Sequence, residues 1–193
     1  MRTELLDAAK ALLWEGGYER MSPRKVLERS GAGQGSLYHH FPTKRALAAA
    51  ALVEVERELV ESAERVLGGD APPLDRVRAW LALERNGLKG CRLGRLANEV
   101  EVLGSDELRS ALAGYFNRVL ALLTATLSEA KERNELRASA APADLAAALV
   151  ALVQGGYVLS RALANEKLIS RATRGAMSLL DAAAHSSSRS RSD

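Results

Sequence analysis

Glycine, proline and helix-capping residues follow one another so closely between residues 16 and 43 that only short helices fit between them. Ser22 is a good N-cap and proline favours the first helical position, so a helix is predicted over Pro23–Ser30. Gly31-Ala32-Gly33 predicts a tight turn, and Gln34–His40 predicts a second helix of about two turns. Two short helices joined by a three-residue turn that contains glycine have the geometry of a DNA-binding helix-turn-helix.

The rest of the chain predicts longer helices and no sheet. Hydrophobic residues make up 47% of the sequence and aromatic residues only 4%. Alanine and leucine dominate, and both lose little entropy on entering a helix. No β-branched run alternates with a period of two. We therefore expect an all-α fold with about nine helices, over residues 2–15, 23–30, 34–40, 44–67, 74–85, 92–103, 106–133, 143–164 and 168–184.

The net charge of +3 lies at the N-terminal end of the chain. Residues 1–50 contain eight Lys or Arg and five Asp or Glu, whereas the remaining residues contain 19 of each sign. A positive excess confined to one end is expected where that end contacts a polyanion such as DNA. The alternative is an ordinary solvated surface.

The short second helix combines an apolar side with an unusual outer side. Leu37 and Phe41 are four residues apart and can both point into a core. The positions left for the outer face carry no large aliphatic group: Gln34, Gly35, Ser36, Tyr38 and His39. Their amide, hydroxyl, phenol and imidazole groups suit base edges and phosphate oxygens. The alternative for Tyr38 is a place in the core.

The stretch from Leu5 to Leu47, above all GSLYHHFPTK, resembles the DNA-binding domain of the TetR/AcrR family of bacterial repressors. The resemblance implies that the outer face of Gln34–His40 enters the major groove and contacts phosphates. It implies a phosphate contact for Lys44 and positions near the DNA backbone for Ser22 and Arg24. Gln34 stands where the family commonly has a basic residue, and an amide pairs better with adenine than with guanine.

The resemblance also implies an organisation and a function. We expect a helix-turn-helix domain over residues 1–50, an effector-binding and dimerisation domain over 51–184, and a disordered polar tail over 185–193. The expected function is a repressor that binds double-stranded operator DNA as a homodimer and is released by a small lipophilic or aromatic effector. The alternative is a non-specific architectural DNA-binding protein without an effector.

An effector pocket is expected between helices of the second domain. Its candidate lining residues are large and apolar, and each could equally be plain core: Trp80, Leu83, Leu93, Leu96, Phe116, Leu120, Leu123 and Tyr157. The segment GCRLGRLANEV, residues 90–100, resembles the LmrA/YxaF-like subgroup of the family. That resemblance implies a planar aromatic or drug-like effector.

The last two predicted helices, 143–164 and 168–184, are too apolar for isolated surface helices. Two such helices from each of two chains could form a four-helix dimer interface. The residues expected there are small or apolar: Ala148, Ala151, Leu152, Gly155, Gly156 and Leu159. The alternative is a monomeric core.

Several other classes of protein are not expected. Cys91 is the only cysteine, so no intramolecular disulfide can form, and it is either a small buried residue or a thiol sensor. His39 and His40 are adjacent, about 100° apart on a helix, and suit a shared metal ion poorly. No catalytic motif, cofactor motif, signal peptide or uncharged apolar run of about 18 residues is evident. We therefore expect a cytoplasmic protein that is no enzyme and has no metal, cofactor or membrane partner.

Overall fold

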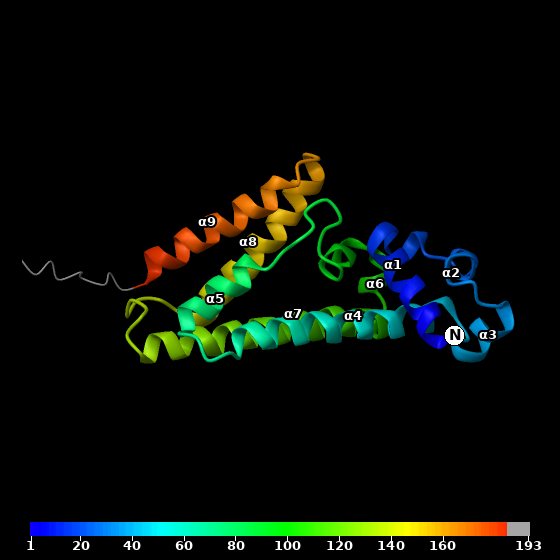
Figure 1. The fold of residues 1–193 in the computed structure, drawn as a ribbon, viewed down its shortest axis with the longest axis horizontal. Coiled ribbons are helices and arrows are strands. Elements are labelled where there is room, and N and C mark those ends of the chain that lie inside the picture. Colours follow the sequence, from blue (N-terminus) through cyan, green and yellow to red (C-terminus); the bar gives the residue numbers. More distant parts are fainter. Residues whose placement is uncertain (185–193) are drawn as a thin grey trace, which may run out of the picture.

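The computed structural model describes residues 1–184, which form nine α-helices and one 3-10 helix (Figure 1). In this part of the chain the only β-type pairing is an isolated bridge between Leu136 and Ala184. The all-α prediction is therefore confirmed, while the predicted tail lies outside the described residues. The elements are α1 Arg2–Arg20, α2 Pro23–Ser30, α3 Gln34–His40, α4 Lys44–Leu67, α5 Pro73–Ala82, η1 Gly94–Asn98, α6 Val100–Leu103, α7 Asp106–Glu132, α8 Pro142–Ala162 and α9 Lys167–Ala183.

The helices form an elongated molecule with a small head at one end (Figure 1). The head consists of α1, α2 and α3. Helices α4 and α7 pack side by side along the long axis, and α8 packs on α9. Helix α5 contacts α4, α7 and α9, so it joins the two pairs. Because α4 begins in the head and ends beside α5, a single helix connects both parts of the molecule.

Side-chain caps fix three helix starts at the predicted residues. The Ser22 hydroxyl accepts a hydrogen bond from the Lys25 amide at 3.3 Å, and the Thr43 hydroxyl accepts one from the Ala46 amide at 3.0 Å. The Ser105 hydroxyl caps α7 in the same way. These bonds satisfy amide groups that the first turn of a helix leaves unpaired.

Three predicted helices have different boundaries. The helix expected to end at Glu15 continues to Arg20 as α1, through a kink at Gly17. The segment expected to be one helix over 92–103 is divided into η1 and α6, and Glu99 between them has an extended backbone (φ −96°, ψ 118°). The helix expected to reach Arg85 ends at Ala82, and the Arg85 guanidinium donates hydrogen bonds to the carbonyls of Trp80, Leu81 and Leu83. A cation at the C-terminal end of a helix also stabilises its dipole.

The core consists of two clusters of buried side chains, and the first extends beyond the head. It contains residues of α1 to α3 together with Leu52 and Val55 of α4 and several residues of the body. Leu93 and Leu96, predicted to line an effector pocket, belong to this head core and are fully buried. The second cluster fills the space among α4, α5, α7, α8 and α9. The domain boundary expected at residue 50 therefore falls within α4 and within a continuous core.

Candidate nucleic-acid interface and ligand cavity

Helix α3 is held by its apolar residues and presents its polar ones. Leu37 is 2% exposed and Phe41 is 5% exposed, so both anchor the helix in the head core. Tyr38 is 47% exposed. Gln34, Gly35 and His39 are also exposed, and Ser36 is half-buried. The alternative that Tyr38 is a core residue is therefore excluded, and the outer face of α3 is free to meet a ligand.

The residues predicted to lie near the DNA backbone are at the starts of α2 and α4, the two helices that precede and follow α3. The Lys44 ammonium lies 4.2 Å from the centroid of the Tyr18 ring, a cation–π contact that holds it at the start of α4. Arg24 is exposed and its Nε donates to Glu28 at 2.8 Å. Because such exposed pairs are weak, Arg24 can exchange this partner for a phosphate. Ser22 uses its oxygen as a cap and still has a hydroxyl proton to donate.

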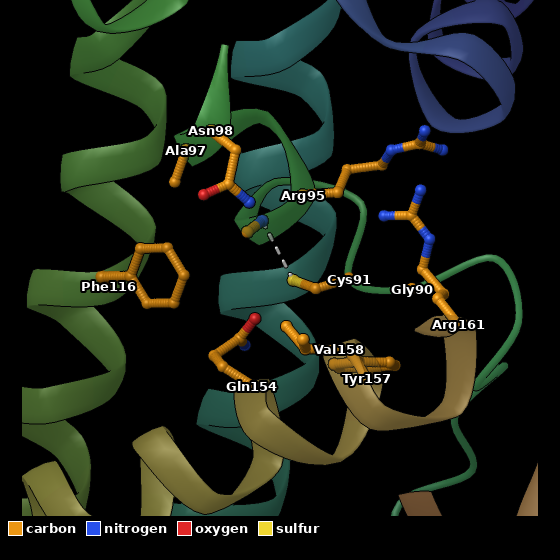
Figure 2. A pocket seen from close by; sticks show the side chains of 11 residues that line it. Gly90, Cys91, Arg95, Ala97, Asn98, Phe116, Gln154, Tyr157, Val158 and Arg161 are labelled. Carbon is orange, nitrogen blue, oxygen red and sulfur yellow. Dashed lines mark hydrogen bonds between the residues drawn. The ribbon is translucent and has the colours of Figure 1, made fainter. Parts of the chain in front are cut away.

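A cavity of about 270 Å³ lies in the body, between residues 90–98, α7 and α8 (Figure 2). Phe116 extends from α7, and Gln154 and Tyr157 extend from α8. The complete lining is Gly90, Cys91, Gly94, Arg95, Ala97, Asn98, Phe116, Gln154, Tyr157, Val158 and Arg161. The cavity thus combines aromatic surface with amide, thiol and guanidinium groups, as ligand sites commonly do.

The cavity contains two of the residues predicted for it, Phe116 and Tyr157. Leu93 and Leu96 are in the head core instead, as described above. The remaining predicted residues belong to the body core or pack against it: Trp80, Leu83, Leu120 and Leu123. Of these, Leu83 also borders a separate hollow next to α9. Apolar spacing identifies inward-facing residues but does not distinguish a core from a cavity wall.

Burial controls the ionisable groups in and near the cavity. It raises the pKa of Tyr157 to about 12, so this phenol stays neutral. Burial likewise raises the pKa of Tyr115, its neighbour on α7. Cys91 is 7% exposed, and its sulfur accepts a hydrogen bond from the Gly94 amide at 3.2 Å.

Residues 90–99, here called the connecting segment, border the cavity on one side and contact the head on the other. The Trp14 indole of α1 donates to the Gly90 carbonyl at 2.9 Å, and Arg95 donates to the Trp14 carbonyl. The two Glu99 carboxylate oxygens accept hydrogen bonds from the amides of Tyr18 and Glu19, at 3.2 and 3.1 Å. These amides follow Gly17, whose left-handed backbone (φ 81°, ψ 179°) kinks α1. A single helix was expected over 92–103, and the contacts of Glu99 with α1 explain why the chain instead forms the short 3-10 helix η1 and breaks at Glu99.

Glu58 of α4 joins the same elements by ion pairs. Its carboxylate lies 3.0 Å from the Lys10 ammonium of α1 and 2.6 Å from the Arg92 guanidinium. Burial raises the pKa of Glu58, but the hydrogen bonds from Arg92 and Lys10 outweigh burial and lower it. The connecting segment, α1 and α4 are therefore joined through Glu58.

The outer faces of α8 and α9 expose large apolar side chains. Leu159 of α8 is 50% exposed, Leu163 directly after α8 is 65% exposed, and Leu179 of α9 is 58% exposed. Among residues 1–184, α8 is the one helix that is long and apolar enough to cross a membrane. Within the protein, 28% of its apolar stretch is buried. Asp144 and Arg161 limit its uncharged run to residues 145–160.

The residues predicted for a dimer interface divide between the two sides of α8. Ala148 and Ala151 are exposed, Leu152 is half-buried, and a Cβ at Gly155 would meet no atom within 4 Å. Gly156 is different, because a Cβ there would lie 2.8 Å from Ala172 and Ile169 of α9. Gly156 therefore permits close packing within the subunit, which corrects its assignment to the interface.

Comparisons with known proteins cover both parts of the chain. The family described as "Bacterial regulatory proteins, tetR family" matches residues 5–51, and "Tetracyclin repressor-like, C-terminal domain" matches residues 73–176. The HTH-type transcriptional repressor DhaR of Mycobacterium sp. (strain GP1) is 26% identical over 82% of this chain and 81% of its own. The nucleoid occlusion factor SlmA of Vibrio vulnificus (strain YJ016) is 28% identical over 80% of each chain. The crystal structure of reduced E. coli NemR superposes with a TM-score of 0.82 at 25% identity, covering 95% of this chain and 96% of the other.

Proposed function

Because the chain belongs to the TetR family of bacterial regulatory proteins, we propose that it is a cytoplasmic repressor that binds operator DNA as a homodimer and leaves it when a small molecule enters the body. The observation that carries this proposal is α3. Buried Leu37 and Phe41 hold the helix, and its exposed side offers hydrogen-bonding groups with no large aliphatic residue among them. The names of the relatives DhaR and KstR, both described as transcriptional repressors, support repression over activation.

A homodimer follows from the apolar outer faces of α8 and α9. One recognition helix reads only a few base pairs, so specific binding needs a second half-site about one helical turn away. A two-fold axis through the α8–α9 face would place Ala151, Gly155 and Leu159 against their copies and bury the exposed leucines. A dimer would therefore account for the exposed apolar face of α8 and α9 and would supply the second recognition helix that specific DNA binding needs.

The effector is proposed to act through the elements that join cavity and head. It must bind the form of the dimer that does not fit the operator more tightly than the form that does. A hundredfold difference requires about 2.7 kcal/mol. Helix α4 and the connecting segment both extend from the cavity region to the head, so a change at the cavity wall alters the spacing of the two α3 helices.

Selection of duplexes from a random pool tests the function against its alternative. A specific repressor should enrich a near-palindromic motif with two half-sites centred roughly 10 base pairs or a multiple apart. The similarity to SlmA, named a nucleoid occlusion factor, favours one other candidate, a DNA-binding protein without an effector. A pool that shows no enriched motif after repeated rounds would support a non-specific architectural protein and refute the repressor.

Replacing Tyr38 by alanine should weaken binding to the selected duplex by about 30-fold, because each of two half-sites loses a contact worth about 1 kcal/mol. Fluorescence anisotropy at fixed salt measures this change. The exposed Tyr38 makes little core contact, so the melting temperature should stay within a few degrees. Tyr38→Phe, which removes only the hydroxyl, separates hydrogen bonding from ring contact. Unchanged affinity of Tyr38→Ala would exclude α3 as the reading helix.

A further inference from the structure

Two guanidinium groups on the cavity wall lack an acidic partner. Arg95 and Arg161 form no ion pair with any carboxylate of residues 1–184, whereas the nearby Arg92 pairs with Glu58. Arg95 donates to the Trp14 carbonyl of α1, and the Arg161 side chain donates no hydrogen bond within the same described range. Figure 2 shows the two groups close together, on the side of the cavity that faces the blue N-terminal segment.

The electrostatics of this corner favour a negative charge. Burial lowers the pKa of Arg95, and the neighbouring charges of Arg161 and Arg20 lower it further. Glu99 opposes this effect, but its two oxygens already accept hydrogen bonds from the amides of Tyr18 and Glu19. An anion between the guanidinium groups would relieve their repulsion and accept hydrogen bonds from both.

The rest of the wall suits a small apolar body with one or two polar atoms. Phe116 and Tyr157 supply aromatic surface, and the amides of Asn98 and Gln154 make no side-chain hydrogen bond with residues 1–184. A volume of about 270 Å³ is just below the ~300–1,000 Å³ of sites for drug-sized molecules. The cavity therefore has room for a compact ligand.

Resting on the proposed function, we infer that the effector is a small organic carboxylate with an aromatic or short aliphatic body. Its carboxylate lies between Arg95 and Arg161, and its body contacts Phe116. Planar guanidinium groups bind carboxylates with paired, charge-assisted hydrogen bonds. This class is narrower than the lipophilic or aromatic effector that the sequence suggested, because it requires a negative charge.

The same arrangement supplies a route to the head. A carboxylate and the Trp14 carbonyl both attract the Arg95 guanidinium, and an anionic acceptor attracts this cation more strongly than a neutral carbonyl does. An anion that engages Arg95 therefore weakens the attachment of α1 to the connecting segment. By linkage, operator DNA must weaken carboxylate binding by the same factor as the carboxylate weakens operator binding.

Matched acids and amides test the charge requirement. Cinnamate is compared with cinnamamide, and hexanoate with hexanamide, by titration calorimetry on the full-length dimer. At least one acid should bind at least tenfold more tightly than its amide. Arg161→Gln, at an exposed residue, should reduce that preference below threefold, whereas Arg137→Gln, an exposed residue of the loop between α7 and α8, should leave it unchanged.

The outcomes distinguish this inference from the function on which it rests. Amides that bind as tightly as the acids, an Arg161→Gln variant that keeps the acid preference, or no binding of either acid would each overturn the anionic effector. Operator binding of the same samples without ligand is measured in parallel. If the ligand-free protein binds the operator tightly, the proposed repressor function holds whatever the effector is. If the unmodified protein does not bind the operator, the repressor function itself is refuted.

Discussion

Glutamate in place of Leu159 should convert the dimer into monomers and weaken operator binding by about a thousandfold. Leu159 is 50% exposed on the α8 face that we assign to the interface. Across a two-fold axis the substitution would place two carboxylates in an apolar contact, where desolvation and mutual repulsion both oppose association. A monomer reads one half-site, and specific binding exceeds non-specific binding by at least about 10³-fold.

Sedimentation equilibrium and anisotropy with the selected duplex measure the two effects together. Val53→Glu is the matched control, because Val53 is 52% exposed on α4, away from α8 and α9. The control should remain a dimer with unchanged operator affinity. A Leu159→Glu protein that stays dimeric would show that another surface forms the interface.

Alanine at Gly17 should lower the free energy of unfolding by about 3 kcal/mol and the melting temperature by about 6–12 °C. Gly17 has φ 81° and ψ 179°, a backbone conformation that is nearly confined to glycine. A Cβ there would also lie 2.1 Å from one Glu99 oxygen, so the carboxylate that holds the kink must move. Backbone strain and a lost contact therefore act at the same position.

A double-mutant cycle with Glu99→Ala separates the two causes of this loss. Glu99→Ala removes the steric conflict but keeps the strained backbone, so Gly17→Ala should cost less in that background than in the unmodified protein. Calorimetry or chemical denaturation gives each free energy. Equal costs in both backgrounds would mean that the contact with Glu99 contributes nothing at Gly17.

Local signals predicted local structure well. Ser22, Thr43 and Ser105 placed three helix starts at the correct residue, because a cap depends on side chains and amides only three positions apart. The outward face of α3 was predictable for the same reason. Leu37 and Phe41 define the buried side, and the remaining positions must point outward.

Contacts between distant residues limited the rest. The break at Glu99 depends on amides of α1 that lie about 80 positions away, which no local pattern reveals. Leu93 and Leu96 have the spacing of a pocket wall, yet they complete the head core. Arg95 and Arg161 were missed because their meeting depends on how α8 lies against the connecting segment. The resemblance of residues 90–100 to one subgroup of the family includes Arg95 but not Arg161.

The continuity of the head core has a consequence for chimeric regulators. Leu93, Leu96 and Leu108 belong to the same buried cluster as the residues of α1 and α3. In a hybrid joined near residue 50, the DNA-binding helices would pack against core residues from a different protein, and those side chains would not match. To keep its promoter preference while changing the inducer, a hybrid should keep Leu93, Leu96 and Leu108 with the N-terminal helices and exchange the cavity-lining positions around them.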